Sequence, residues 1–202
     1  MSSQPDMRRR EELLDQIEAL IRAEGFAQLR VGALAAHLHC SRSTLYRLAP
    51  SKDELVELVF ERYVDRAIDR AKAEAEKLHS PPERIVRFTE IVAEEQARGS
   101  ATFWRDVMND PLVNEVLSET RVRGNRMLKG YLDEGIEIGV FRPANTAFVA
   151  HLIWVCAREA RDPEVLRRYN STTDEATEEI GRIIAYGMGT GSVSSGTGAK
   201  AS

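Results

Sequence analysis

Apolar residues recur at spacings of three and four along most of the chain, which is the pattern of helices rather than of strands. The first segment shows this clearly, because its apolar residues form one stripe that ends at Gly25. The stripe consists of Leu13, Leu14, Ile17, Leu20 and Ile21. No run of alternating apolar and polar residues is long enough to form a strand of a sheet. The sequence therefore predicts an all-α fold.

Capping residues and prolines divide the rest of the chain into further helices. Ser51 and Glu54 have the spacing of a capping box at the start of a long helix, whose part at residues 69–77 is rich in alanine and charge and is expected to be exposed. Pro81-Pro82 ends that unit and opens the next helix. Further helices are predicted at residues 101–109, 112–139, 145–161 and 173–186, the last capped by Thr172 or Thr173, and residues 187–202 form a flexible Gly/Ser-rich tail.

Residues 30–48 are predicted to form a helix, a tight turn and a second helix. The first helix buries Val31, Leu34, Ala35 and Leu38, His39-Cys40 is the turn, and Ser41 caps the second helix. The outer side of the second helix carries Arg42, Ser43, Thr44, Tyr46 and Arg47. Arginine can donate two hydrogen bonds to guanine, and hydroxyls reach phosphates or base edges, so this surface suits a DNA major groove.

Composition restricts where DNA can bind. The 202 residues are 43% hydrophobic and 30% charged, typical of one or two globular domains, and their net charge is −4, which argues against a protein that coats nucleic acid over its whole surface. Residues 1–52 nevertheless hold eight Arg and Lys against six Asp and Glu, and residues 30–52 contain four cations and no acid. Positive charge is therefore concentrated where the groove-binding helix is expected.

The sequence also indicates a cytoplasmic location. Cys40 and Cys156 are too far apart in the chain to suggest a disulfide framework. The longest strongly apolar stretch, residues 147–157, is interrupted by His151 and is shorter than the roughly 20 residues that a membrane span needs. The arginines near the N-terminus are not followed by an apolar segment, so no signal peptide is expected.

Residues 13–59 resemble the DNA-binding domain of the tetracycline-repressor (TetR) family. The matching features are Gly25-Phe26, Leu34-Ala35, Ser41, Thr44-Leu45-Tyr46 and residues 50–55 (PSKDEL), and residues 134–142 resemble the end of the family's seventh helix. The resemblance implies a homodimer with a DNA-binding domain of three helices at residues 1–50. About six helices at residues 51–186 would then bind a small-molecule effector and dimerise. It also implies a transcriptional regulator, most often a repressor, which leaves a pseudo-palindromic operator when the effector binds.

Four positions depart from the family pattern. Leu29-Arg30 stands where threonine is usual, and His39 replaces the turn glycine, so His39 is expected either to adopt an unusual backbone angle or to reshape the turn. Ser43 stands at the usual small position after the cap, and Leu48-Ala49 replaces an aromatic pair. These departures argue against transferring another member's operator to this chain.

The candidate site residues follow from these observations. The predicted DNA contacts are Arg30, Ser41, Arg42, Ser43, Thr44, Tyr46, Arg47 and Lys52, with Tyr46 and Lys52 on phosphates. Residues 8–10 are three arginines that either reach the minor groove or remain in solvent. The candidate lining of an apolar effector cavity is Phe88, Trp104, Met108, Met127, Tyr131, His151 and Trp154, although core or dimer contacts explain the same pattern. Residues 147–157 and 178–186 are candidate dimer helices, and Arg105-Asp106 is expected on a solvated face.

Other functions remain as alternatives. His37, His39 and Cys40 suggest a metal site, but no fourth ligand stands at a fixed spacing, and the glycine-rich tail lacks the Gly-Lys-Ser/Thr of a phosphate loop. No metal or other cofactor is expected. A small metal-dependent or hydrolytic helical enzyme is one alternative, although the chain contains no H-E-x-x-H motif and no nucleophile elbow. A DNA-binding regulator without an effector, whose aromatic body is simply core, is the other.

Overall fold

The structure is a computed structural model that describes residues 4–160 and 162–189 of the chain. Within these residues every regular element is a helix, and an isolated bridge between Phe141 and Gly189 is the one strand-like pairing. The helices are α1 (Gln4–Glu24), α2 (Val31–His37), α3 (Arg42–Tyr46), α4 (Lys52–Ala75), α5 (Pro81–Ala97), α6 (Ala101–Asn109), α7 (Pro111–Glu137), α8 (Thr146–Glu159), α9 (Pro163–Tyr169) and α10 (Thr173–Gly187). The predicted all-α class is confirmed.

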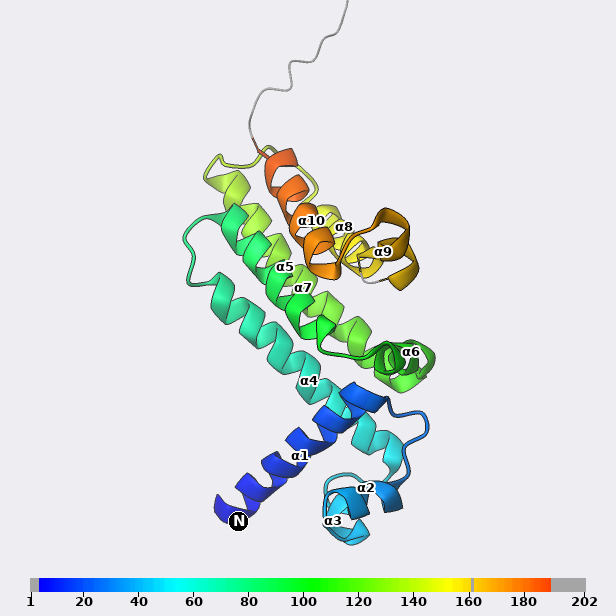
Figure 1. The fold of residues 1–202 in the computed structure, drawn as a ribbon. Helices are drawn as coiled ribbons and strands as arrows, with labels where there is room; N and C mark the ends of the chain where they lie inside the picture. The colour runs from blue at the N-terminus through cyan, green and yellow to red at the C-terminus, as the bar shows by residue number, and fades with distance from the viewer. Residues whose placement is uncertain (1–3, 161, 190–202) are drawn as a thin grey trace, which may run out of the picture.

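The helices form a small N-terminal group and a larger body that share α4 (Figure 1). α1, α2 and α3 lie at one end of the molecule, and α4 runs from that end along the body. In the body α4 packs against α5 and α7, α7 packs against α8, and α10 covers α5. α6 lies beside the C-terminal end of α1, so it touches both groups.

Two hydrophobic cores lie one after the other along α4. The first core joins the apolar stripes of α1–α3 to the first half of α4 and includes Phe103 and Val107 of α6. The second core joins the last part of α4 to α5, α7 and α8. Ala71 and Ala75 have no exposed surface, so the expectation of an exposed segment at residues 69–77 is wrong for this face of α4. Their small side chains allow α4 and α5 to pack closely together.

Most predicted helix boundaries agree with the structure to within two residues. Ser51 Oγ accepts a hydrogen bond from Glu54 N at 3.1 Å, and Thr172 with Glu175 forms a full capping box at the start of α10. α9 was not predicted from the sequence. It is a seven-residue helix with Asp162 as its N-cap and Asn170, in the left-handed region, as its C-cap. In the part of the chain with described structure, the body therefore has seven helices rather than about six.

The first residues of the predicted tail are packed against the body. Gly187 is the last residue of α10, Met188 is buried, and Arg142 N donates to Met188 O at 2.8 Å. Residues 190–202, the remainder of the predicted tail, lie outside the described residues. Across the described helices, none is both long enough and apolar enough to span a membrane.

Candidate functional site

α2, the turn and α3 form a helix-turn-helix unit at one end of the molecule (Figure 1). Leu34 and Ala35 of α2 and Leu45 of α3 are buried in the first core, as the spacing predicts. His39 in the turn has φ +50°, so of the two expected alternatives it adopts the unusual backbone angle. The turn is closed by Cys40 N, which donates to Ala35 O at 3.0 Å.

Three hydroxyls converge at the start of α3. Ser41 is the N-cap, and its Oγ accepts a hydrogen bond from Thr44 N at 3.1 Å. The same oxygen lies 2.8 Å from Ser43 Oγ and 2.9 Å from Thr44 Oγ1. Ser41 Oγ is engaged by the cap, and Thr44 Oγ1 also accepts a hydrogen bond from Arg47 Nη2 at 3.4 Å, so Ser43 is the hydroxyl of this group with the fewest contacts.

The eight predicted DNA-contact residues lie on α2, α3 and the start of α4. Thr44 and Lys52 are partly buried, and the other six are exposed: Arg30, Ser41, Arg42, Ser43, Tyr46 and Arg47. The Arg42 guanidinium lies against Gly32 of α2, where an added Cβ would come within 2.6 Å of Nη2. Lys52 Nζ donates to Ala27 O at 3.0 Å. The fold therefore brings this set together, with Arg42 and Lys52 partly engaged in local contacts.

The cations of this region form no ion pairs with the described residues, whereas most cations of the body are paired. Among the described residues of the body, Arg121, Arg126 and Arg142 are exceptions. Arg30, Arg42, Arg47 and Lys52 form no ion pair with any carboxylate of the described residues, whereas Arg62, Arg66, Arg70, Arg84, Arg87 and Arg98 of the body are all paired. Arg8, Arg9 and Arg10 are exposed and face Glu11 or Glu12 of the same helix. The unpaired charges of α2–α4 are thus available to phosphates.

The loop between α1 and α2 is held by α6. Asp106 Oδ2 accepts hydrogen bonds from Phe26 N at 2.8 Å and Ala27 N at 2.9 Å, and Ser100 N donates to Arg22 O at 2.9 Å. Gly25 in this loop has φ +83°, and a Cβ there would lie 2.5 Å from Asp106 Oδ2. Arg105 is exposed as expected, but Asp106 is only 7% exposed, so its placement on a solvated face is wrong.

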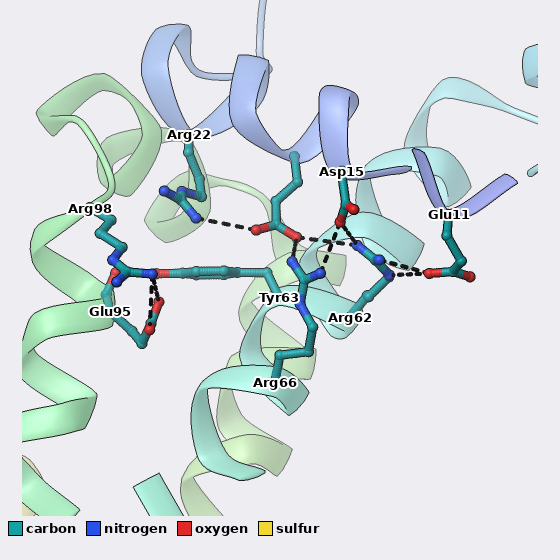
Figure 2. Close-up of polar contacts among 9 residues, drawn as sticks. Glu11, Asp15, Arg22, Arg62, Tyr63, Arg66, Glu95 and Arg98 are labelled. Carbon is teal, nitrogen blue, oxygen red and sulfur yellow. Dashed lines mark hydrogen bonds and ion pairs between the residues drawn. The ribbon is translucent and has the colours of Figure 1, made fainter. Parts of the chain in front are cut away.

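A network of ion pairs joins α1 to α4 (Figure 2). Arg62 reaches Glu11 at 2.7 Å and Asp15 at 2.8 Å, and Arg66 reaches Asp15 at 2.9 Å. Partial burial alone would raise the pKa of Asp15, but hydrogen bonds from Arg66 and Arg62 outweigh it and hold this pKa below its ordinary value. The network fixes the long α1 against the helix that continues into the body.

The network continues toward α5 through a buried carboxylate and a tyrosine. Glu18 is 5% exposed and pairs with Arg66 and, at 3.2 Å, with Arg22, whose guanidinium lies 5.4 Å from the centre of the Tyr63 ring. Tyr63 OH donates to Glu95 O at 2.5 Å, and burial raises the pKa of this phenol. Figure 2 shows the Tyr63 ring extending toward the Glu95–Arg98 pair, with Arg22 above the ring. These contacts connect the helix-turn-helix end of the molecule to α5.

Two neighbouring recesses lie inside the body, of about 280 Å³ and 370 Å³ of atom-free space that is partly open to solvent. The smaller, which we call the distal recess, lies among α5, α7, α8 and α10, and the larger, the proximal recess, lies among α4, α5, α6, α7 and α8. Val92, Gln96 and Trp154 line both recesses. The proximal recess is also lined by Tyr63, which belongs to the contacts just described.

The predicted effector residues separate into three groups. Phe88 lines the distal recess, Trp104 the proximal recess and Trp154 both. Met127 and Tyr131 contribute to the second core, where the Tyr131 ring packs edge-on against Phe88. Met108 is 56% exposed and His151 is exposed, and neither lines a recess. The fold therefore brings Phe88, Trp104 and Trp154 to the recesses and leaves Met108 and His151 on the surface.

Two buried polar atoms in this region lack hydrogen-bond partners among the described residues. They are Nε1 of Trp154 and the hydroxyl of Tyr131. By contrast, Nε1 of Trp104 donates to Gln96 O at 2.9 Å. The Trp154 indole packs directly on Gly124 of α7, where a Cβ would lie 2.4 Å from Cζ2. A buried donor without an acceptor is costly, so the Trp154 N–H is a natural contact for a ligand.

The candidate dimer helices carry exposed apolar side chains. On α8 these are Phe148, Leu152 and Val155, and on α10 they are Ile183 and Tyr186. Phe148 is 57% exposed and Ile183 is 61% exposed. In the described residues no group of three His, Cys, Asp or Glu side chains is placed to hold a metal ion. His37 and His39 are exposed, and Cys40 is half-buried.

Glu18 and Arg121 were not identified from the sequence as site residues, and Asp106 was expected in solvent, although the helical period marks all three. Glu18 follows Leu14 by four residues, Asp106 follows Phe103 by three, and Arg121 follows Leu117 by four, so all three occupy positions on apolar stripes. A charged residue at such a position is a candidate for a buried pair or a ligand contact.

The sequence of the helix-turn-helix region matches a known family. Residues 13–59 match the model of the family described as bacterial regulatory proteins, tetR family. The match covers α2, α3, most of α1 and the first part of α4. A search of the curated proteins finds no relative of this chain.

Solved structures with the same fold cover nearly the whole chain. A protein described as a transcriptional regulator of Saccharomonospora viridis, in complex with choline, is 19% identical, with a TM-score of 0.76 over 91% of this chain and 98% of its own. A TetR-family regulator of Cytophaga hutchinsonii is 13% identical, with a TM-score of 0.77 over 95% and 100%. The fatty acid degradation regulator FadR of Bacillus halodurans is 15% identical, with a TM-score of 0.72 over 93% and 98%. At these identities the likeness establishes the fold.

Proposed function

Since this chain belongs to the tetR family of bacterial regulatory proteins, we propose that it is a dimeric repressor that binds a DNA operator and is released by a small molecule. The observation that carries the proposal is the set of unpaired cations on α2–α4 beside the hydroxyls of α3. Cations with no carboxylate partner, exposed on a helix-turn-helix, suit a polyanion that reaches them from solvent.

α3 is the proposed recognition helix in the major groove. Arg42, Ser43 and Arg47 are exposed and form the proposed base-reading group, while Arg30, Tyr46 and Lys52 are the proposed phosphate contacts. Arginine contributes most to base discrimination when it forms two bonds to guanine. For this, Arg42 has to leave its contact with Gly32 when DNA binds.

The proposed homodimer forms through α8 and α10. Their exposed apolar side chains make a face that water solvates poorly, and a second copy of the same face would cover it. The two copies of α3 would then read half-sites about 34–36 Å apart, one turn of DNA, in a pseudo-palindromic operator. The proposed place of action is the cytoplasm.

The proposed effector site is the pair of recesses, and α6 is the proposed link to DNA binding. Trp104 of α6 lines the proximal recess, and Asp106, two residues further, holds the α1–α2 loop. A ligand that moves Trp104 therefore also strains the contacts that position α2 and α3. A coupling of about 1–3 kcal/mol is the usual size for such linked sites. The choline complex of the S. viridis protein is consistent with a small-molecule effector in this fold.

Selection of bound fragments from genomic DNA of the source organism, followed by titrations at several salt concentrations, tests the DNA-binding part. Arg47→Ala is expected to weaken binding to the selected fragment by about 1–3 kcal/mol and to relax its sequence preference. Lys52→Gln keeps a donor for Ala27 O but removes the charge, so the slope of log K against log salt is expected to fall by about one.

Arg126→Ala is the matched control, because Arg126 is exposed on α7 and forms no ion pair with the described residues. It is expected to change neither affinity nor slope. If no fragment is enriched at low salt, or if Arg126→Ala weakens binding as much as Arg47→Ala does, the proposed interface is wrong.

A further inference from the structure

We propose that the proximal recess binds an amphipathic anion, whose oxyanion head group pairs with Arg121 and whose apolar part lies between α4, α5 and α7. The proposal rests on the proposed function in its choice of site, and it adds the chemical class of the ligand. Four observations support it: among the described residues, Arg121 has no acid partner, the one acid in the wall is already paired with arginines, some hydrogen-bond donors of the wall are unused, and the rest of the wall is apolar.

Arg121 is a cation in the wall of the recess without an acid partner. It lies on α7, is partly buried, and its Nη2 donates to Ser118 Oγ at 2.8 Å. No carboxylate of the described residues lies within ion-pair distance of its guanidinium. A partly buried guanidinium with only a neutral partner gains most from an added carboxylate or phosphate, because both match its planar pair of donors.

Glu95, the one acid among the described residues of the wall, is already neutralised. Its carboxylate is 9% exposed and pairs with Arg70 and, at 3.1 Å, with Arg98. A cationic ligand would therefore find no free carboxylate here and would meet Arg121. The charges that face the recess favour an anion.

The donors of the wall point to the same class. The phenol of Tyr63 and the indole N–H of Trp104 already donate to backbone oxygens of α5, at 2.5 Å and 2.9 Å. Thr120 Oγ1 donates to Val116 O at 2.9 Å. Trp154 is 8% exposed and its Nε1 has no acceptor among the described residues. The unused hydrogen-bonding capacity thus includes a guanidinium and an indole N–H, which both need an acceptor, and the side-chain amide of Gln96, which can donate as well as accept.

The remainder of the wall is apolar, which suits the hydrocarbon part of a ligand. Val64, Ile68, Val92 and Leu117 contribute hydrocarbon surface. The cavity volume that water-sized spheres can occupy is only about 30 Å³, against about 300–1,000 Å³ for usual ligand sites, so a ligand enters only if side chains of the wall move. Since Trp154 lines both recesses, displacement of its indole would extend the space toward the distal recess.

Intrinsic fluorescence is a direct readout, because the chain contains two tryptophans and both line the proximal recess. The full-length protein is titrated with decanoate, decyl phosphate, decanol and decyltrimethylammonium, each below its micelle concentration. We expect saturable binding of decanoate or decyl phosphate at least tenfold tighter than that of decanol, with the ammonium compound weakest. The two anions distinguish a carboxylate from a phosphate head group.

Arg121→Gln isolates the head-group contact. The variant is expected to bind the preferred anion about tenfold more weakly, near the affinity for decanol, and to leave decanol binding unchanged. Arg126→Gln on the same helix is the matched control and is expected to retain the preference. Trp154→Phe, read from Trp104, keeps an aromatic ring and is expected to weaken anion binding severalfold more than decanol binding.

The proposal is overturned if decanol or the ammonium compound binds more tightly than both anions, if none of the four binds saturably, or if Arg121→Gln keeps the preference. Operator binding without ligand is measured separately, so its failure concerns the proposed function alone. If an anion binds through Arg121 but does not release DNA, the ligand class stands and the proposed release mechanism is wrong.

Discussion

His39 holds the turn between α2 and α3 in a conformation that side chains disfavour. At φ +50° a residue with a Cβ is strained by about 1–2 kcal/mol. The neighbouring hydrogen bonds keep it there, since His39 N donates to Ala36 O at 3.2 Å and Cys40 N to Ala35 O at 3.0 Å. The helix-turn-helix therefore contains strain at one residue, shortly before α3.

Replacing this histidine with glycine removes the strain. Glycine also makes the unfolded chain more flexible, which costs about 0.4–1 kcal/mol. We expect His39→Gly to raise the free energy of unfolding by up to about 1 kcal/mol, measured by urea denaturation of the full-length protein.

Ala36→Gly is the control, because Ala36 is exposed in α2 with ordinary helical geometry, and it should lower stability by about 0.5–1 kcal/mol. A loss of stability in His39→Gly equal to that in the control would mean that the turn is not strained.

At the scale of residues, the burial of apolar side chains could be predicted from the sequence better than the burial of charged side chains. Leu34, Leu45 and Phe88 are buried as the spacing requires. The burial of the carboxylates of Glu18 and Asp106 was not predicted. A carboxylate is buried only where ion-pair or hydrogen-bond partners stabilise it, and for both residues some of these partners are distant in sequence. Asp106 receives its hydrogen bonds from residues 26 and 27, which only the folded chain brings near.

At the scale of elements, the ion pairs between α1 and α4 make their contact sensitive to acid. The folded-state pKa of Asp15 lies below the ordinary 3.8, chiefly because its hydrogen bonds to Arg66 and Arg62 outweigh burial. A lowered carboxyl pKa gives stabilisation that is complete above the unfolded-state pKa and is lost as the pH falls through the folded-state value. Asp15 is more than half exposed, so the contribution is at most about 1 kcal/mol.

We therefore expect Asp15→Asn to be less stable than the natural chain at pH 7, with a difference that is constant above about pH 5 and shrinks as the pH falls below about 4. Urea denaturation at a series of pH values measures it. Asp69→Asn, an exposed position on α4 with no ion pair among the described residues, should show no such difference. A difference for Asp15→Asn that persists unchanged at pH 2 would exclude the ion pairs as its cause.

Elements with strong periodicity were predictable, and short or cap-defined ones were not. The predicted helix at residues 101–109 coincides with α6, and α7, α8 and α10 agree to within two residues. α9 was missed because seven residues give too little repetition to reveal a stripe. Its signals are local instead: Asp162 caps the helix and Pro163 opens it.

At the scale of the whole molecule, the exposed apolar side chains of α8 and α10 determine the proposed assembly. Phe148→Glu places a charge on the face that a second copy is expected to cover, and a two-fold dimer contains the change twice. Each lost phenyl contact amounts to about 1.5–3 kcal/mol, so the dissociation constant of the dimer is expected to rise by at least about a hundredfold. Sedimentation velocity at several concentrations measures this, and operator affinity should fall with it.

Met108→Glu is matched in exposure, at 56% against 57%, and lies on α6 away from the proposed face. It should leave the dimer intact. If both variants stay dimeric, or if the natural chain is monomeric, the dimer does not form through α8 and α10.

The recesses could not be derived from the sequence at this scale. Spacing identifies Phe88, Trp104 and Trp154 as inward-facing, and the structure agrees, but Met108 and His151 have similar residue character and lie on the surface. Whether an aromatic side chain fills the core or lines a recess depends on how closely α4, α5, α6, α7 and α10 pack around Trp154 of α8. The helical period contains no information on the distances between helices.

α6 contacts both the wall of the proximal recess, through Trp104, and the α1–α2 loop, through Asp106. Thermodynamic linkage makes such a connection reciprocal. If a bound small molecule lowers the affinity for the operator by some factor, the bound operator lowers the affinity for the small molecule by the same factor. In a cell, copies bound to the proposed operator would then bind the small molecule only at higher concentrations than copies free in solution. The threshold for induction would therefore depend on how many operator sites the genome provides.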